Sequence, residues 1–484
     1  MTIVQSTVRI ASGAIAGTGS DVRVYRGIPY AAPPVGPLRW RPPQPVAPWN
    51  GVHDGSRFGY DPVQLADPER GSRAPGISED CLTLNVWAPA EVPAGGAPVL
   101  VWFDGGGFVG ASGAKARIDG ERFARLGAVL VTVNYRVGVF GFLAHPALTA
   151  ESPQHASGNY GFHDAIAALR WVRDNISAFG GDSQRVTAFG ESAGGAVAAL
   201  LLISPLARGL VDRVILQSPG SFRPLCPLAD AENAGRAAGD DLAAMRALPA
   251  AELLALNAKI NPAVRGLTIP RPLRPIIDGW SIDRDEVEAF RSGAFAHVPT
   301  IVGSNANEGG WFTANIPVTT TAKLRDYVAQ NFGSDFDEAW THYGAVGDAD
   351  VVRAVGDAFG DAQFSYGARS LAREIAKRQP KTFRYLFTHA GAHTSDPPVH
   401  SDDVVYVFGN GTFDARDQRV SDAMMAAWVR FAETGDPNGA GAPHWAPYDA
   451  ARDNYLAFGT DLAEGTRWRA EPLAFIERFY AARA

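Results

Sequence analysis

Short apolar runs alternate with helix-forming segments through the first half of the chain. Strand-like runs cover residues 99–103, 128–134, 185–189 and 211–217, and segments of helical pattern, 119–126, 163–177 and 194–203, lie between them. The runs VLVWF and AVLVTV show no polar alternation, which is typical of strands that helices cover on both faces. The pattern therefore predicts an α/β fold with a large, mostly parallel central sheet flanked by helices.

Two polar, helix-leaning regions, 230–261 and 319–377, interrupt the later part of this series, in which the runs 300–303 and 383–387 are expected to add strands to the sheet. We expect one domain over 1–484, with insertions at roughly 223–275 and 312–380 that form a lid over the carboxyl edge of the sheet. An amphipathic helix over 421–433, ended by GDPNG, is expected to close the fold.

Composition and charge exclude several classes of partner. The net charge of -7, without a basic run, disfavours nucleic acid and anionic membranes. The longest apolar stretch, 196–203, is far shorter than the ~20 residues of a transmembrane helix, and the first residues lack the pattern of a signal peptide. We therefore expect a soluble cytoplasmic protein, a monomer or weak homo-oligomer. Its two cysteines, Cys81 and Cys226, have no metal-ligand spacing and are expected to be reduced.

A nucleophile candidate lies in the segment Gly190-Glu191-Ser192-Ala193-Gly194, which fits G-x-S-x-G. It stands between the apolar run RVTAF and the helix-forming run GGAVAALLLI, which is the strand–turn–helix setting of a nucleophile elbow. The flanking glycines permit a sharp turn that holds the serine in a strained backbone conformation. The alternative is an ordinary glycine-rich turn in which the serine only caps the helix.

A second glycine-rich segment, Asp104-Gly105-Gly106-Gly107-Phe108, directly follows the strand run VLVWF. Consecutive glycines let backbone N–H groups face outward, and such donors, with the N–H of the residue after the nucleophile, form an oxyanion hole. The alternative is a phosphate-binding loop, which the missing Lys or G-K-[ST] and the charge of Asp104 disfavour.

A serine nucleophile needs a neutral imidazole and a carboxylate that orients it. On a doubly wound sheet the acid follows the serine and precedes the histidine, and Glu308, in the loop after the run 300–303, has this position. Its alternative role is that of a solvated loop carboxylate. The loop 388–403 contains His389, His393 and His400, which sequence reasoning does not separate; a metal site at His393, Asp396 and His400 would match no familiar ligand spacing.

These pieces together resemble the type-B carboxylesterases, the family of bacterial p-nitrobenzyl-type esterases and animal cholinesterases, on the α/β-hydrolase fold. The likeness runs almost end to end. The segments that carry it are YRGIPYAAPPVGPLRW (25–40), EDCLTLNVW (79–87), DGGGF (104–108), NYRVGVFGFL (134–143), GNYGFHD (158–164), FGGDSQRVTAFGESAGG (179–195), GSNANEGG (303–310) and HSDDVVYVFG (400–409).

The resemblance implies a catalytic triad and the residues around it. It makes Ser192 the nucleophile, Glu308 the acid and His400 the base, and it implies Gly106, Gly107 and Ala193 as oxyanion donors. Further residues that it places beside the triad or in the substrate pocket are Glu191, Ser218, Phe108, Trp311, Phe312 and Asp104.

Three departures from the family pattern concern this site. Asp104 stands where bacterial members usually have His, and its charge would oppose an oxyanion, so we expect it to be paired and turned into the loop. Ser401-Asp402-Asp403 replaces a segment with Gly and a later Glu, which puts the contacts of His400 in question. Cys81 matches a family disulfide position, but no cysteine precedes it.

The resemblance implies a serine carboxylesterase for small to medium, apolar or aryl esters, without metal or organic cofactor. The alternatives are the same acyl-enzyme used for amide, carbamate or lactone cleavage or for acyl transfer, and a catalytically inactive binding scaffold. A cholinesterase is disfavoured because no Trp occurs between Trp49 and Trp87, where that branch places its cation-binding aromatic.

Overall fold

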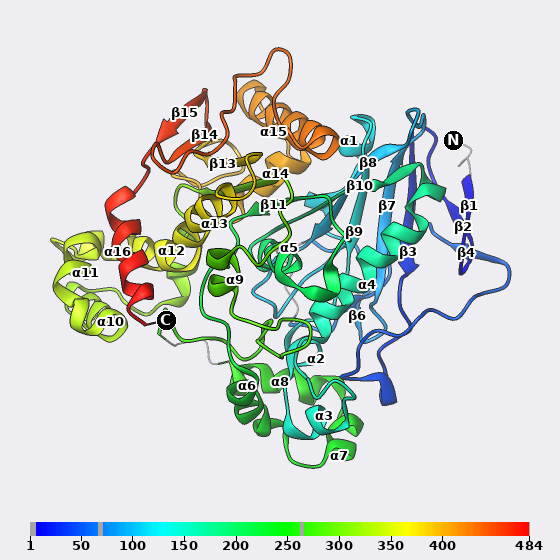
Figure 1. Cartoon of the computed structure of the whole chain (residues 1–484), viewed down its shortest axis with the longest axis horizontal. Coiled ribbons are helices and arrows are strands. Elements are labelled where there is room, and N and C mark those ends of the chain that lie inside the picture. Colours follow the sequence, from blue (N-terminus) through cyan, green and yellow to red (C-terminus); the bar gives the residue numbers. More distant parts are fainter. Residues whose placement is uncertain (1–5, 66–70, 262–265, 484) are drawn as a thin grey trace.

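The computed structural model describes residues 6–65, 71–261 and 266–483. Its centre is a ten-stranded sheet of order β15-β14-β13-β12-β11-β10-β8-β9-β7-β3 (Figure 1). The strands are β3 (Val22–Pro29), β7 (Thr83–Pro89), β8 (Ala97–Phe103), β9 (Val129–Val133), β10 (Gly181–Glu191), β11 (Arg213–Gln217), β12 (Thr300–Asn305), β13 (Thr382–Phe387), β14 (Asn454–Phe458) and β15 (Leu462–Thr466).

The sheet is parallel from β9 through β14 and antiparallel at both edges, where β7 pairs with β9, β3 with β7 and β15 with β14. The expected mostly parallel sheet is confirmed. The strands β3 and β7 at one side of the sheet and β14 and β15 at the other were missed, and the last two follow the helix that was expected to close the fold. That helix, α15 (Ala415–Thr434), also begins earlier than predicted and is not the last element, so this expectation was wrong.

Helices cover both faces of the sheet, which explains the unbroken apolar strands. Along β8, Val99, Val101 and Phe103 pack into one core cluster, and Leu100 and Trp102 pack into another. Successive side chains of a strand point to opposite faces, so each face has its own core. Helices α4 (Tyr160–Asn175) and α5 (Ala193–Ile203) cover the first face, and α14 (Asp402–Phe408) and α15 cover the second.

The chain also forms fifteen α-helices besides α15, and a few minor strands, in the described residues. The helices are α1 (Glu121–Arg125), α2 (Gly138–Phe142), α3 (Pro146–Glu151), α4 (Tyr160–Asn175), α5 (Ala193–Ile203), α6 (Leu228–Gly235), α7 (Leu242–Ala247), α8 (Ala250–Ile260), α9 (Glu286–Ser292), α10 (Thr321–Phe332), α11 (Phe336–Tyr343), α12 (Val351–Gly360), α13 (Tyr366–Ala376), α14 (Asp402–Phe408) and α16 (Ala470–Ala481). One small sheet consists of β1 (Ser6–Ile10), β2 (Gly13–Gly17) and β4 (Val52–Asp54). Another consists of β5 (Asp61–Pro62) and β6 (Ile77–Ser78).

The two regions expected as insertions are helical and lie between consecutive strands of the sheet. Helices α6, α7 and α8 lie between β11 and β12, and α10 to α13 lie between β12 and β13 (Figure 1). Residues 262–265 of the first region lie outside the described residues.

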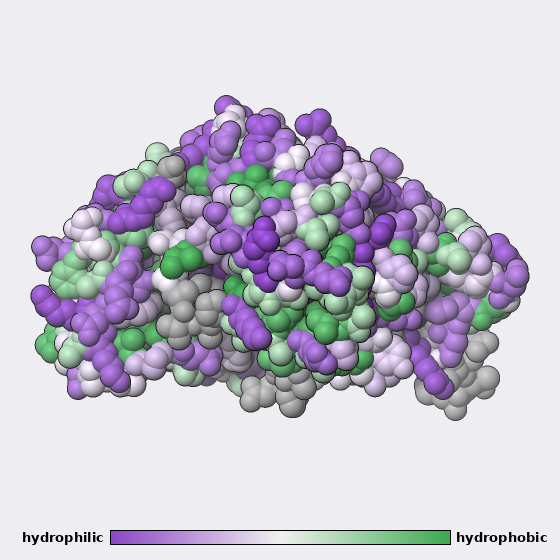
Figure 2. All heavy atoms as spheres, turned by 90° about the horizontal axis from the view of Figure 1, so that it is seen from below, coloured by the Kyte–Doolittle hydropathy of each residue, from purple (hydrophilic) through white to green (hydrophobic). Residues whose placement is uncertain are grey.

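The described helices include none with both the length and the hydrophobicity of a membrane span. On the face shown in Figure 2, hydrophobic residues form patches separated by hydrophilic ones.

Candidate active site

Ser192 occupies a sharp turn between β10 and α5, with backbone angles of φ 58 and ψ -117. A positive φ is costly for a residue with a side chain, so this turn holds the serine in a strained conformation, as the sequence predicts. Two glycines make the turn fit. A Cβ added at Gly190 or Gly194 would lie 2.5 Å or 1.8 Å from the carbonyl oxygen of Phe103, at the end of β8.

His400 and Glu308 form a buried pair beside Ser192. His400 Nδ1 lies 2.6 Å from Glu308 Oε2. The other Glu308 oxygen accepts hydrogen bonds from the Ser218 hydroxyl and from the backbone N–H of Asn305, both at 2.6 Å. These three contacts fix the carboxylate, so the imidazole it holds has one orientation.

A second carboxylate, that of Glu191, faces the opposite ring nitrogen of His400. The Nε2 and Glu191 Oε1 atoms lie 2.9 Å apart, although Nε2 makes no hydrogen bond of normal geometry. Burial alone would lower the pKa of His400, but Glu191 and Glu308 outweigh burial and raise it to about 10. In this arrangement Glu191 therefore favours the protonated imidazole.

The residues after His400, which depart from the family pattern, form a hydrogen-bonded support for it. Ser401, at φ 74, donates to Glu191 Oε1 at 2.7 Å. Asp402 accepts the backbone N–H of Val399 at 2.8 Å and that of Ser395 at 2.9 Å. Burial raises the pKa of Asp403 to about 6. The Asp403 carboxylate accepts from Tyr385 and Gln217 at 2.8 and 2.9 Å behind the pair.

The glycine loop after β8 lies against the elbow. Gly106 and Gly107 have φ 138 and φ 63, and both line the same cavity as Ser192. Ala193 is the first residue of α5, where a backbone N–H has no partner within the helix. These positions fit an oxyanion hole.

The Asp104 carboxylate is fully buried and directed away from the cavity. It pairs with Lys115 Nζ and accepts the backbone N–H of Ser112 at 3.0 Å. A side chain paired in this way does not face the nucleophile.

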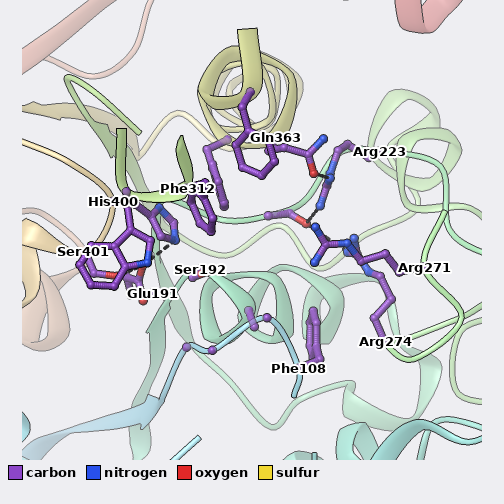
Figure 3. A pocket seen from close by; sticks show the side chains of 18 of the residues that line it. Phe108, Glu191, Ser192, Arg223, Arg271, Arg274, Phe312, Gln363, His400 and Ser401 are labelled. Atoms are coloured by element: carbon purple, nitrogen blue, oxygen red, sulfur yellow. Dashed lines mark hydrogen bonds and ion pairs between the residues drawn. The ribbon is translucent and has the colours of Figure 1, made fainter. Parts of the chain in front are cut away.

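A cavity of about 340 Å³ opens over Ser192. Phe108, Trp311 and Phe312 line it, as the resemblance implies, whereas Asp104 and Ser218 do not. Phe364, which sequence reasoning missed, packs on the His400 ring with a centroid separation of 4.1 Å. The cavity is also lined by four arginines that sequence reasoning missed. They are Arg117 and the three labelled in Figure 3, Arg223, Arg271 and Arg274.

The other histidines of the loop 388–403 lie outside this cavity. His389 Nε2 lies 2.7 Å from Asp417 Oδ1 in a buried pair of its own, and exposed His393 contacts the carbonyl oxygen of Thr412. The described residues contain no cluster of three or more His, Cys, Asp or Glu suited to a metal ion.

The fold and the site define this protein as a serine hydrolase on the α/β-hydrolase fold. The model of the carboxylesterase family matches residues 4–476, so the chain belongs to the carboxylesterase family.

Named relatives cover nearly all of the chain. Fumonisin B1 esterase of Sphingopyxis macrogoltabida is 45% identical over 94% of this chain and 86% of its own length. Cocaine esterase of Homo sapiens is 32% identical over 95% and 88%, and the liver carboxylesterase of Sus scrofa is 30% identical over 95% and 89%.

Proposed function

We propose that this carboxylesterase hydrolyses its esters in two steps through an acyl-enzyme on Ser192, with His400 as base and Glu308 as the acid that orients it. His400 takes the serine proton as the oxygen attacks the ester carbonyl. The backbone N–H groups of Gly106, Gly107 and Ala193 stabilise the oxyanion. His400 then protonates the leaving alcohol. In the second step His400 takes a proton from water, which attacks the acyl carbon, and the acid leaves as the proton returns to Ser192.

The contact that supports this assignment most directly is the 2.6 Å separation of His400 Nδ1 and Glu308 Oε2, beside a serine on a strained turn. Of the histidines in loop 388–403, His400 shares a cavity with Ser192. Glu191 would stabilise the imidazolium that forms in each step, because its carboxylate faces the ring.

The test is hydrolysis of a p-nitrophenyl ester series, combined with labelling by a fluorophosphonate probe. Ser192→Ala is expected to lose the label and to fall at least ~100-fold in kcat, since the nucleophile carries most of the rate enhancement. Ser334→Ala, at an exposed serine, is the matched control and should keep both signals. A Ser192→Ala enzyme that retains more than a hundredth of the activity would contradict the proposal.

Small to medium, apolar or aryl esters are the proposed substrates, because aromatic side chains line much of the cavity. The named substrates of the relatives, fumonisin B1 and cocaine, differ from each other, so neither is transferred to this chain. Product analysis with added alcohols or amines distinguishes hydrolysis from acyl transfer. We propose a monomer or weak homo-oligomer.

A further inference from the structure

Three of the four arginines that line the cavity lie together, whereas the charge of the fourth, Arg117, interacts with Glu191. Arg223, Arg271 and Arg274 lie together on one side of Ser192, and His400, Glu191 and Ser401 lie on the other (Figure 3). Glu191 and Asp402 are the carboxylates that line the cavity within the described ranges. Glu191 contacts His400, and Asp402 accepts the backbone N–H of Val399, next to His400. Within the described ranges, the arginine side therefore has no acidic lining residue.

Two of the arginines converge on one carbonyl oxygen close to the nucleophile. The Nη2 atoms of Arg223 and Arg274 each lie 3.1 Å from the oxygen of Gly220, so they are separated by no more than twice that distance. The backbone N–H of Gly220 in turn donates to the backbone oxygen of Ser192 at 3.4 Å. Two guanidinium groups this close repel each other, and an anion between them would relieve the repulsion.

The hydrogen bonds of Arg223 go to neutral acceptors. Its Nη1 donates to Gln363 Oε1 and its Nη2 to Gly220, while its Nε is buried without a hydrogen-bond partner. Across the described residues, no carboxylate lies within 4.0 Å of the Arg223 or Arg271 guanidinium. The buried acid Glu286 accepts hydrogen bonds from Ser221 Oγ at 2.5 Å and from the backbone N–H of Arg223 at 3.0 Å, and its charge interacts with Arg274 and Arg223 from outside the cavity lining.

The geometry of the reaction assigns this basic side to one half of the ester. His400 must protonate the leaving oxygen, so the alcohol departs on the His400 side of the carbonyl. The acyl chain then extends away from His400, toward the three arginines. A guanidinium group binds a carboxylate through paired, charge-assisted hydrogen bonds.

We propose that Arg223, Arg271 and Arg274 bind a free carboxylate on the acyl group, so that half-esters of dicarboxylic or polycarboxylic acids are the preferred substrates. This inference rests on the proposed function, and it replaces the apolar acyl group proposed there by one that ends in a carboxylate. The Ser192 oxygen displaces the alcohol, which takes its proton from His400, and the acyl-enzyme keeps the distal carboxylate. Water then adds to the acyl carbon, releases the free polyacid and returns the proton to Ser192.

The test compares kcat/KM for mono-4-nitrophenyl adipate with that for 4-nitrophenyl hexanoate, which lacks the distal charge. The wild type should prefer the anionic ester at least about tenfold, and Arg223→Gln and Arg271→Gln should each lower this preference about tenfold or more. Arg353→Gln, at an exposed arginine of α12, is the matched control and should leave the preference unchanged. Arg271→Lys, which keeps the charge, should retain part of it.

Three outcomes overturn the inference. A wild type that hydrolyses the hexanoate as fast as the adipate, with Ser192 still labelled, would contradict the carboxylate site while the proposed function stands. A preference for 4-acetoxybenzoate over phenyl acetate, without one for the adipate, would move the site to the alcohol side. If no ester reacts, the proposed function fails, and the carboxylate site is then tested by itself through thermal stabilisation with adipate. Adipate should stabilise the wild type and not Arg271→Gln, and a wild type that adipate does not stabilise would overturn the inference.

Discussion

At the scale of single residues, His400 is held between two carboxylates rather than one. Glu308 and Glu191 both raise its pKa above the ordinary histidine value, against the effect of burial. A general base works in its neutral form, so activity must rise with pH through the pKa of His400. The acid limb of kcat/KM should therefore lie above the usual titration range of histidine.

Glu191→Gln removes one of these charges and is expected to lower the pKa of His400. The neutral imidazole then persists to lower pH, and the acid limb of kcat/KM should move down by about 1 pH unit or more. Glu288→Gln, at an exposed carboxylate of α9, is the matched control. A pH profile that is unchanged in Glu191→Gln would mean that Glu191 does not act on the free base.

The buried Asp104–Lys115 pair makes a prediction about stability. Lys115→Met leaves the Asp104 carboxylate buried without its cation, which is expected to cost about 3–5 kcal/mol of unfolding free energy. The double variant Asp104→Asn, Lys115→Met should cost less, because the buried charge of Asp104 is removed together with its cation and Asp61, the neighbouring carboxylate, loses a like charge as well as a cation. Chemical unfolding measures both, with exposed Lys323→Met as control. A single variant as stable as the double would contradict this account.

Sequence reasoning predicted Ser192, the glycine loop and Glu308 because each follows an apolar strand run. It left His389, His393 and His400 open, since all three lie in one loop and only the fold separates them. The contact between Ser401 and Glu191 spans 210 residues, and no local pattern indicates it. The arginine side escaped notice for the same reason, because Arg223 and Arg274 meet only through Gly220.

At the scale of elements, the elbow depends on the close approach of α5 to the end of β8. Gly194→Ala is expected to destabilise the fold by about 1–3 kcal/mol or more, because its Cβ would overlap the carbonyl oxygen of Phe103. The higher helix propensity of alanine offsets only about 1 kcal/mol of this. Gly347→Ala, where an added Cβ meets nothing within 4 Å, is the matched control. Thermal unfolding checks the pair; equal melting temperatures would contradict the steric argument.

The sheet interior could be predicted and its last edge could not. Strands such as β8 and β9 are buried along their whole length, so their sequences are continuous apolar runs. In β15 every residue is at least partly exposed, and its sequence LAEGT has no apolar run that distinguishes it from a loop. Burial on both faces thus made these inner strands visible, and its absence hid β15. The buried strand β7 was missed for another reason, because it precedes the alternating series of strand and helix runs.

At the scale of the whole molecule, the two cysteines lie in different cores. Cys81 is fully buried in the large cluster on one face of the sheet. Cys226 lies in a small cluster with Ala144, Ala231 and Ile276. Both are free thiols. The division of the chain into one domain with two insertions stays a prediction, and the reactivity of these thiols bears on it.

The two thiols should become accessible by different openings. Burial raises the pKa of Cys226 to about 11 and that of Cys81 well above its usual range, so neither forms a reactive thiolate in the native state. Cys226 needs only the local opening of a small cluster, whereas Cys81 needs the main core to open.

Thiol titration with Ellman's reagent tests this difference. We expect two thiols to react in unfolded, unreduced protein. In native protein we expect the same two thiols to react in two phases. Cys226→Ala should remove the faster phase and Cys81→Ala the slower. If both thiols react at the rate of global unfolding, the region around Cys226 does not open independently, and the chain unfolds as one cooperative unit.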